Sequence, residues 1–214
     1  MEYGLQIMNS NGKIFATPDT PFFHLTSKQV LNLSQMNIGG KAFNYNTGIS
    51  ANLRMVCYTR LSGVSAVSVA QYQSNGTWWL RIESTNSCTA VFYIFTNDIP
   101  ASSGGWGMDF FDGSGRRVYS TSTRPLQNMQ TALTYRGTNA VDVGHPTAVI
   151  ATICDSFVRP IQQRDVQLMN CYPCAYNNRI EITVVGRGVM PSESGFSFAI
   201  FGGVVNYINA SLYD

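Results

Sequence analysis

The chain has 214 residues, enough for one large domain or two small ones, because a domain of about 100 to 150 residues can bury its own core. Fourteen basic and twelve acidic side chains leave a formal charge of +2, and charged residues are 12% of the chain, against roughly 25% in ordinary soluble proteins. With only three lysines (Lys13, Lys28 and Lys41), the chain lacks the clustered basic residues that neutralise phosphates, so we expect no nucleic-acid binding. A surface so poor in charge resists self-association weakly, which favours an assembly component over a free cytosolic enzyme.

Alternating apolar and polar residues, bounded by Gly, Asn and Pro, recur along the whole chain, and no window of a dozen residues has the apolar spacing of an amphipathic helix. An opening hairpin is predicted over residues 3–13. The clearest strands then follow at residues 51–58, 64–73, 77–83, 90–96, 147–154, 179–185 and 196–201. Short strands separated by turn residues predict an all-β fold, a sandwich or barrel, rather than a parallel sheet with crossover helices.

The predicted elements fall into two similar sets. Residues 3–13 (YGLQIMNSNGK) align without a gap on residues 106–116 (WGMDFFDGSGR). In each copy the last glycine belongs to a hairpin turn, where it takes the left-handed conformation. The repeat-defining positions of the two hairpins are Tyr3, Gly4 and Gly12, and Trp106, Gly107 and Gly115.

Three further stretches repeat in the same order. Residues 51–57 match 148–154 in spacing, the turn pair Asn75-Gly76 matches Asn177-Asn178, and residues 90–95 match 196–201. Such an order indicates an internal duplication. We therefore predict two tandem antiparallel β-sandwich domains, residues 1–103 and 104–214, joined by the small-residue linker 100–105 (PASSGG).

Neither the N-terminal residues nor any later segment resembles a targeting or membrane-spanning element. Residues 1–10 lack the basic run and apolar stretch of a secretory signal, and no stretch approaches the roughly 18 apolar residues of a membrane-spanning helix. We expect neither secretion nor membrane insertion. The cysteines form an odd set without a regular framework, typical of a protein that folds where thiols stay reduced; they are Cys57, Cys88, Cys154, Cys171 and Cys174.

Cys171 and Cys174 have the spacing of a redox dithiol, whose first thiolate is normally activated at the start of a helix. Here a turn sequence, AYNN, follows them. A zinc site would need a second pair of Cys or His ligands at suitable spacing, and none is present. The favoured interpretation is two semi-buried thiols near a hairpin, with a local disulfide, a redox pair and a zinc site as alternatives.

Trp78 and Trp79 are neighbours in a predicted strand, so their side chains point to opposite faces. If Trp78 lies inside with Leu80 and Ile82, then Trp79 shares the outer face with Arg81 and Glu83. A Trp beside a charged pair could be partly covered by a loop, could seal a subunit interface, or could stack on a sugar ring. Tyr45, in a nearby polar loop, is a further candidate for stacking on a ligand.

No catalytic residue, metal ligand or cofactor site is predicted. His24 and His145 are the only histidines, and each is interpreted as a structural residue, because Pro146 restricts His145 and an apolar run surrounds His24. Asp109 and Asp112 flank the second hairpin turn, where turn chemistry alone explains an aspartate. Two long polar loops, at 38–48 and 130–144, remain candidate binding sites.

The opening YGLQIMNSNGK resembles the start of a group of small tailed-bacteriophage proteins that begin with a YGxxIxNxxGK hairpin. The resemblance rests on Tyr3, Gly4, Ile7, Asn9, Gly12 and Lys13, and more loosely on Trp106, Gly107, Phe110, Asp112, Gly115 and Arg116. It implies β-sandwich modules of the virion, in the tail tip or fibre region. The motif occurs once, near the N-terminus, in that group, whereas this chain carries a second copy.

Together these features predict a non-enzymatic structural component of a bacteriophage virion, in the tail or tail tip, that folds in the host cytoplasm before assembly. Its expected partners are other tail proteins and further copies of itself in a homo-oligomer or ring. The alternative is a receptor- or carbohydrate-binding module that uses Trp79, Tyr45 or the glycine-rich loops to hold a host surface glycan. An enzyme acting on cell-wall polymers is the weakest hypothesis, because no paired general acid and base is present at suitable spacing.

Overall fold

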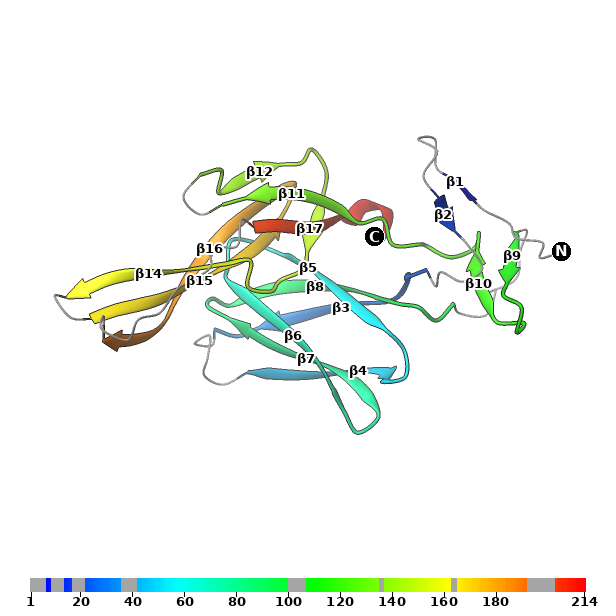
Figure 1. The fold of residues 1–214 in the computed structure, drawn as a ribbon, viewed down its shortest axis with the longest axis horizontal. Helices are drawn as coiled ribbons and strands as arrows, with labels where there is room; N and C mark the ends of the chain where they lie inside the picture. Colours follow the sequence, from blue (N-terminus) through cyan, green and yellow to red (C-terminus); the bar gives the residue numbers. More distant parts are fainter. Residues whose placement is uncertain are drawn as a thin grey trace.

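The structure, a computed structural model, describes residues 7–8, 14–16, 22–35, 42–99, 107–134, 137–162, 165–191 and 203–214. The described chain is nearly all β, as predicted, and is organised in several sheets (Figure 1). Its helical part is a single 3-10 turn, η2 (Ala210–Leu212). No helix among these residues is long and apolar enough to cross a membrane.

We refer to residues 1–103 as the first half and to 104–214 as the second half. The strands of the first half are β1 (Ile7–Met8), β2 (Ile14–Ala16), β3 (His24–Leu33), β4 (Phe43–Ser50), β5 (Met55–Leu61), β6 (Val67–Ser74), β7 (Thr77–Ser84) and β8 (Cys88–Thr96). β1 and β2 pair as a hairpin, β3, β8 and β5 pair in that order, and β4, β7 and β6 form a separate three-stranded sheet. All these pairings are antiparallel.

The strands of the second half are β9 (Asp109–Phe111), β10 (Arg117–Ser120), β11 (Met129–Leu133), β12 (Ala140–Asp142), β13 (Thr147–Val149), β14 (Asp155–Gln162), β15 (Asp165–Tyr176), β16 (Arg179–Pro191) and β17 (Gly203–Asn209). β9 and β10 pair as a hairpin. β11, β17 and β13 pair in that order, as do β12, β16 and β15, all antiparallel. The order of pairing is therefore the same in both halves, with β14 as an additional strand beside β15.

The two hairpins also share their register. In the first, Ile7 pairs with Ala16 and Met8 with Ile14, and the register shifts between the two pairs. In the second, Phe110 pairs with Tyr119 and Phe111 with Arg117, with a shift at the same place. When the alignment of residues 3–13 with 106–116 is continued along the chain, the two pairs of the first hairpin fall on the two pairs of the second. Figure 1 shows both hairpins at the end of the molecule where the N-terminus is marked.

Backbone pairing crosses the predicted boundary between the halves. Thr59 of β5 pairs antiparallel with Val149 of β13, and Leu61 of β5 pairs parallel with Tyr176 of β15. Strands of both halves therefore belong to one ten-stranded sheet. The predicted linker, 100–105, lies outside the described residues. The internal duplication and its boundary stay predictions.

Each half contains a hydrophobic core. The first core contains Leu33, Ile49, Leu61, Val69, Leu80, Ile82, Phe92 and Ile94, with Ala151 and Cys174 added from the second half. The second core contains Leu133, Val149, Cys171, Ala175, Ile180, Ile182 and Val205. A junction cluster joins the halves and contains Tyr58, Tyr93, Phe95, Ala148, Ile208, Ala210 and Tyr213. The cores are thus only partly separate.

The position of strand β8 in the fold explains its almost continuously apolar sequence. It lies between β3 and β5, with Phe92 and Ile94 in the first core and Tyr93 and Phe95 in the junction cluster. Because side chains alternate along a strand, both faces of β8 are buried. Phe95 meets the ring of Tyr213 edge-on, with centroids 4.9 Å apart.

Both Asn-containing turns predicted from the sequence close hairpins. Asn75 (φ 50°) and Gly76 (φ 74°) connect β6 to β7, and Asn177 (φ 50°) lies in the two-residue connection from β15 to β16. Positive φ angles give such short turns the twist of the strands they join, and Asn and Gly adopt them most readily.

Several predicted elements need correction. The region 38–48, predicted as a loop, contains most of β4, and 130–144 contains most of β11 and all of β12. The strand predicted at 147–154 ends at Val149. The predicted match of residues 51–57 with 148–154 is displaced. Met55 lies opposite the end of β8, and Thr147 lies opposite the end of β17, so the structure makes Met55 the counterpart of Thr147. Residues 196–201 lie outside the described part of the chain.

Candidate functional site

The two faces of strand β7 carry different side chains. Leu80 and Ile82 point into the first core, and Trp78 packs against that core while its Nε1 donates a hydrogen bond to the Leu53 carbonyl at 2.8 Å. The predicted inward set is therefore confirmed. Trp79 and Arg81 lie on the opposite side of the sheet, where Trp79 is half-buried and Arg81 exposed.

Trp79 is one member of an aromatic pair. It lies opposite Tyr72 of β6, and the two rings are stacked with centroids 6.4 Å apart and an interplanar angle of 27°. Trp79 Nε1 donates to the Ser74 carbonyl at 3.2 Å, which holds the indole in place. The partial cover of Trp79 therefore comes from a neighbouring strand of the same sheet, rather than from the loop considered in the sequence analysis.

Polar side chains of β4 complete this surface. Asn46 lies opposite Trp79 and Asn44 opposite Arg81, and both asparagines are exposed. The Tyr72 hydroxyl donates to Asn44 Oδ1 at 3.3 Å, linking the outermost strands of the sheet. We name as the amide–aromatic face the set Asn44, Asn46, Ala70, Tyr72, Trp79 and Arg81.

Glu83 was expected to be exposed beside Trp79 and Arg81, and this expectation is wrong. It is 5% exposed, and Arg187 of β16 reaches it from the second half. One carboxylate oxygen accepts a hydrogen bond from Arg81 Nη2 at 3.0 Å, and the other lies 3.7 Å from Arg187 Nη1. Arg187 Nη2 also donates to the buried Tyr172 hydroxyl at 2.7 Å. Glu83 therefore joins the halves of the chain instead of facing a ligand.

Tyr45 does not belong to the amide–aromatic face. It lies opposite Leu80 in β4 and is half-buried against the first core. Because side chains alternate in strands, Tyr45 and Trp79 point to opposite sides of the sheet. Trp79 and Tyr45, predicted as alternative stacking residues, therefore cannot act together on one ligand face.

The second hairpin follows the chemistry predicted for it. Gly115 has φ +80°, and a Cβ at Gly107 would lie 2.8 Å from the Thr121 hydroxyl oxygen, so both positions favour glycine. Asp112 accepts hydrogen bonds from the backbone and side chain of Ser114 and from Arg116, and these bonds lower the pKa of its carboxyl to about 2. Tyr3, Gly4, Gly12 and Trp106 lie outside the described residues.

The two histidines have structural surroundings. His24 is fully buried at the start of β3, its Nδ1 bonds the Thr123 hydroxyl, and burial lowers its pKa to about 4. The rings of Phe22 and Tyr119 lie beside it. His145 stacks on Tyr207, with centroids 6.2 Å apart. The Thr123 hydroxyl donates its proton to the Ser120 carbonyl at 2.8 Å, so it accepts a hydrogen bond from His24 instead of being activated by it.

Cys171 and Cys174 point to opposite faces of β15 and lie in different cores. A local disulfide between them is therefore excluded, because their side chains diverge. Both thiols are buried, and burial raises the pKa of Cys174 to about 11. Cys57 and Cys88 are free thiols, and Cys154 Sγ donates a hydrogen bond to the Cys171 carbonyl at 3.4 Å.

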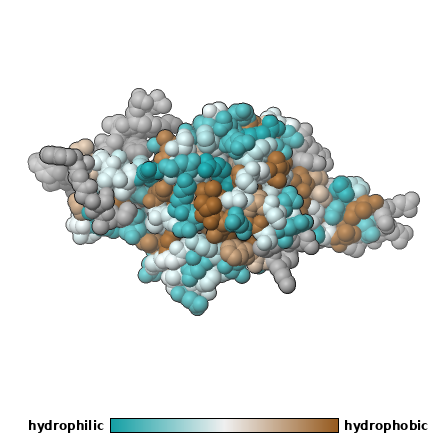
Figure 2. Space-filling model, turned by 180° about the vertical axis from the view of Figure 1, so that it is seen from behind, coloured by the Kyte–Doolittle hydropathy of each residue, from teal (hydrophilic) through white to brown (hydrophobic). Residues whose placement is uncertain are grey.

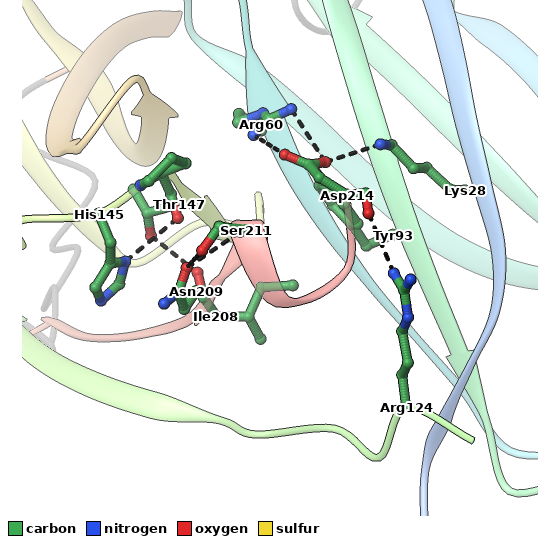
Figure 3. A network of polar contacts seen from close by, with 11 residues as sticks. Lys28, Arg60, Tyr93, Arg124, His145, Thr147, Ile208, Asn209, Ser211 and Asp214 are labelled. Atoms are coloured by element: carbon green, nitrogen blue, oxygen red, sulfur yellow. Dashed lines mark hydrogen bonds and ion pairs between the residues drawn. The ribbon is translucent and has the colours of Figure 1, made fainter. Parts of the chain in front are cut away.

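A polar cluster around Asp214 holds the end of the second half against the first (Figure 3). The Asp214 carboxylate accepts hydrogen bonds from Lys28 Nζ and Arg60 Nη1, each at 2.8 Å, and from the Tyr93 hydroxyl at 2.7 Å. Arg124 Nη1 lies 3.3 Å from the Asp214 carbonyl oxygen, which accepts its hydrogen bond. Burial alone raises the pKa of Asp214, but bonds from Lys28, Tyr93 and Arg60 outweigh it and lower the pKa to about 2.

Tyr72 was not among the residues predicted for a site, whereas Asn44 and Asn46 lie within 38–48, a segment predicted as a candidate binding loop. Tyr72 could have been found, because a two-residue turn at Asn75-Gly76 places Ser74 opposite Thr77 and therefore Tyr72 opposite Trp79. Asn44 and Asn46 were assigned to a loop, and no local signal pairs that segment with β7. Comparison with protein-family models, curated proteins and solved structures finds no match for the chain.

Proposed function

We propose that the chain is a non-enzymatic structural component of a bacteriophage virion, in its tail, built from two copies of one β-sandwich domain. It folds in the host cytoplasm and then joins the particle through contacts with other tail proteins and with further copies of itself. The observation that carries this proposal is the repetition of one pairing order, each time preceded by a hairpin of the same register.

A repeated domain has a direct use in an assembly. Two similar domains in one chain present two similar surfaces, so a ring can close from fewer chains or match a neighbouring ring of different symmetry. The sparse charge of the chain supports the same role, since charged residues are only 12% of it and low surface charge favours association. The resemblance of the opening hairpin to small tail proteins of phages supplies the kind of particle.

The hairpins are the surfaces that such contacts would use. In the second hairpin, Met108 and Phe111 expose 63% and 54% of their surface, and both are apolar. Exposed apolar residues at a projecting end are typical of positions that a partner covers. Figure 2 shows that hydrophobic side chains also surface elsewhere, in separate groups divided by hydrophilic ones.

The proposal is tested by following an epitope-tagged chain through particle purification. We expect it to copurify with intact particles in a fixed copy number and to be located at the tail by immunogold labelling. Phe111→Ser should reduce incorporation, whereas Val204→Ser, which alters a side chain that is 55% exposed elsewhere, should not. Absence of the unmodified tagged chain from purified particles would overturn the proposal.

A further inference from the structure

We propose that the amide–aromatic face binds neutral oligosaccharides, with a sugar ring against the Tyr72–Trp79 pair and its hydroxyl groups bonded by Asn44 and Asn46. This inference goes beyond the structural role above, since a protein can occupy a place in a particle without binding any glycan. The face lies on the separate sheet β4-β7-β6, seen along the lower side of the molecule in Figure 1.

The aromatic pair is organised before any ligand arrives. The rings of Tyr72 and Trp79 lie within 27° of parallel, and each ring is anchored by its polar atom, Trp79 to the Ser74 carbonyl and Tyr72 to Asn44. Both side chains keep part of their surface exposed. An aromatic ring offers a large, stiff apolar surface to the C–H groups of a pyranose, and prior ordering reduces the entropy lost on binding.

The asparagines supply donors beside this pair. Asn46 Oδ1 accepts a hydrogen bond from the Gly48 amide at 2.9 Å, and Asn44 Oδ1 accepts one from Tyr72. These bonds orient the side-chain amides and leave the two N–H groups of each Nδ2 for a ligand. Sugar hydroxyl and ring oxygens accept such bonds, so the face offers an apolar surface and directional donors side by side.

Charge and composition favour a neutral sugar over an acidic polymer or a protein. Arg81 is the one charged residue of the face, and it is engaged with Glu83, which it shares with Arg187, so the face lacks the group of cations that an acidic polymer would need. Aromatic residues and Arg are enriched in protein interfaces as well, but the centre of such an interface is depleted in charged residues and more apolar than the rest of the surface. Here the neighbours of the pair within the face are amides, a guanidinium and Ala70.

The test uses the full chain and a glycan array that contains neutral and acidic oligosaccharides, followed by titration calorimetry with the best neutral ligand. We expect binding of neutral oligosaccharides accompanied by a change in Trp fluorescence. Trp79→Ala and Asn46→Ala should each weaken binding at least tenfold. The control Gln73→Ala, an exposed residue on the same sheet, should leave the affinity unchanged, and urea midpoints check that all variants are folded.

The proposal is overturned if no neutral oligosaccharide binds, if only acidic ones bind, or if Trp79→Ala binds as tightly as the unmodified chain. It is also overturned if a neighbouring protein covers this face in the particle. Failure here is distinguishable from failure of the structural role. A Trp79→Ala chain that enters particles normally and has lost glycan binding supports both proposals, while a chain that binds glycan but never enters particles supports this one alone.

Discussion

Replacement of Glu83 by glutamine tests the contact between the two halves at a single group. Glu83→Gln keeps the shape of the side chain and removes its charge, so Arg187 and Arg81 lose their ionic partner. Removing one member of a buried pair costs about 3 to 5 kcal/mol. Arg187 and Arg81 keep solvent access, with side chains 24% and 50% exposed, so we expect a smaller loss of about 1 to 3 kcal/mol.

Double-mutant cycles separate the two partners of Glu83. Combining Glu83→Gln with Arg187→Met should give a coupling energy of about 1 kcal/mol, within the range for contacting charged residues. The matched cycle with Arg81→Met should give about 0.5 kcal/mol or less, because exposed ion pairs contribute little. Urea unfolding followed by circular dichroism provides the free energies. A coupling of zero to Arg187, together with a measurable coupling to Arg81, would refute the contact between β7 and β16.

Three further predictions concern single residues. Burial lowers the pKa of His24 from 6.5 to about 4, so the unfolded chain binds the proton more readily than the folded chain. The free energy of unfolding should therefore fall as the pH drops from 6.5 to about 4. His24→Phe should make the urea midpoint nearly independent of pH over that range. The pKa of Asp214 is lowered from 3.8 to about 2, so its contribution to folding stability should be complete above pH 4 and disappear towards pH 2. Asp214→Asn should remove this part of the acid-induced loss of stability and leave the pH dependence due to His24 unchanged. Asn177 has φ 50°, so Asn177→Ala should lower folding stability by about 1 kcal/mol, while Asn177→Gly should leave it nearly unchanged. Thermal unfolding of the two variants measures this difference.

The sequence predicts those parts of the fold that depend on neighbouring residues. Alternation along β7 correctly assigns Leu80 and Ile82 to the core, and the turn pairs Asn75-Gly76 and Asn177-Asn178 correctly place two hairpins. Both signals are local, because strand periodicity and turn geometry are set within a few residues.

What the sequence could not predict depends on contacts between distant segments. Glu83 alternates correctly onto the outer side of β7, but it is buried there and contacts Arg187, which lies more than a hundred positions later in the sequence. Strand β4 was missed because its outward positions are Asn, Gly and Ser, which are typical of loops, although Tyr45, Thr47 and Ile49 alternate inward. The pairing of β5 with β13 has no local sequence signal, because which strands meet at an edge depends on the whole assembled sheet.

The two halves are joined through β5, β13 and the junction cluster, and the most direct test of this arrangement is a measurement of whether they unfold as one unit. Leu133 is fully buried in the second core, so Leu133→Ala should cost about 2 to 5 kcal/mol. In a Trp106→Phe background, Trp fluorescence comes only from Trp78 and Trp79 of the first half. If the halves unfold as one unit, Leu133→Ala lowers the urea midpoint equally by fluorescence and by circular dichroism. An unchanged fluorescence midpoint, with a second transition by circular dichroism, would contradict this arrangement.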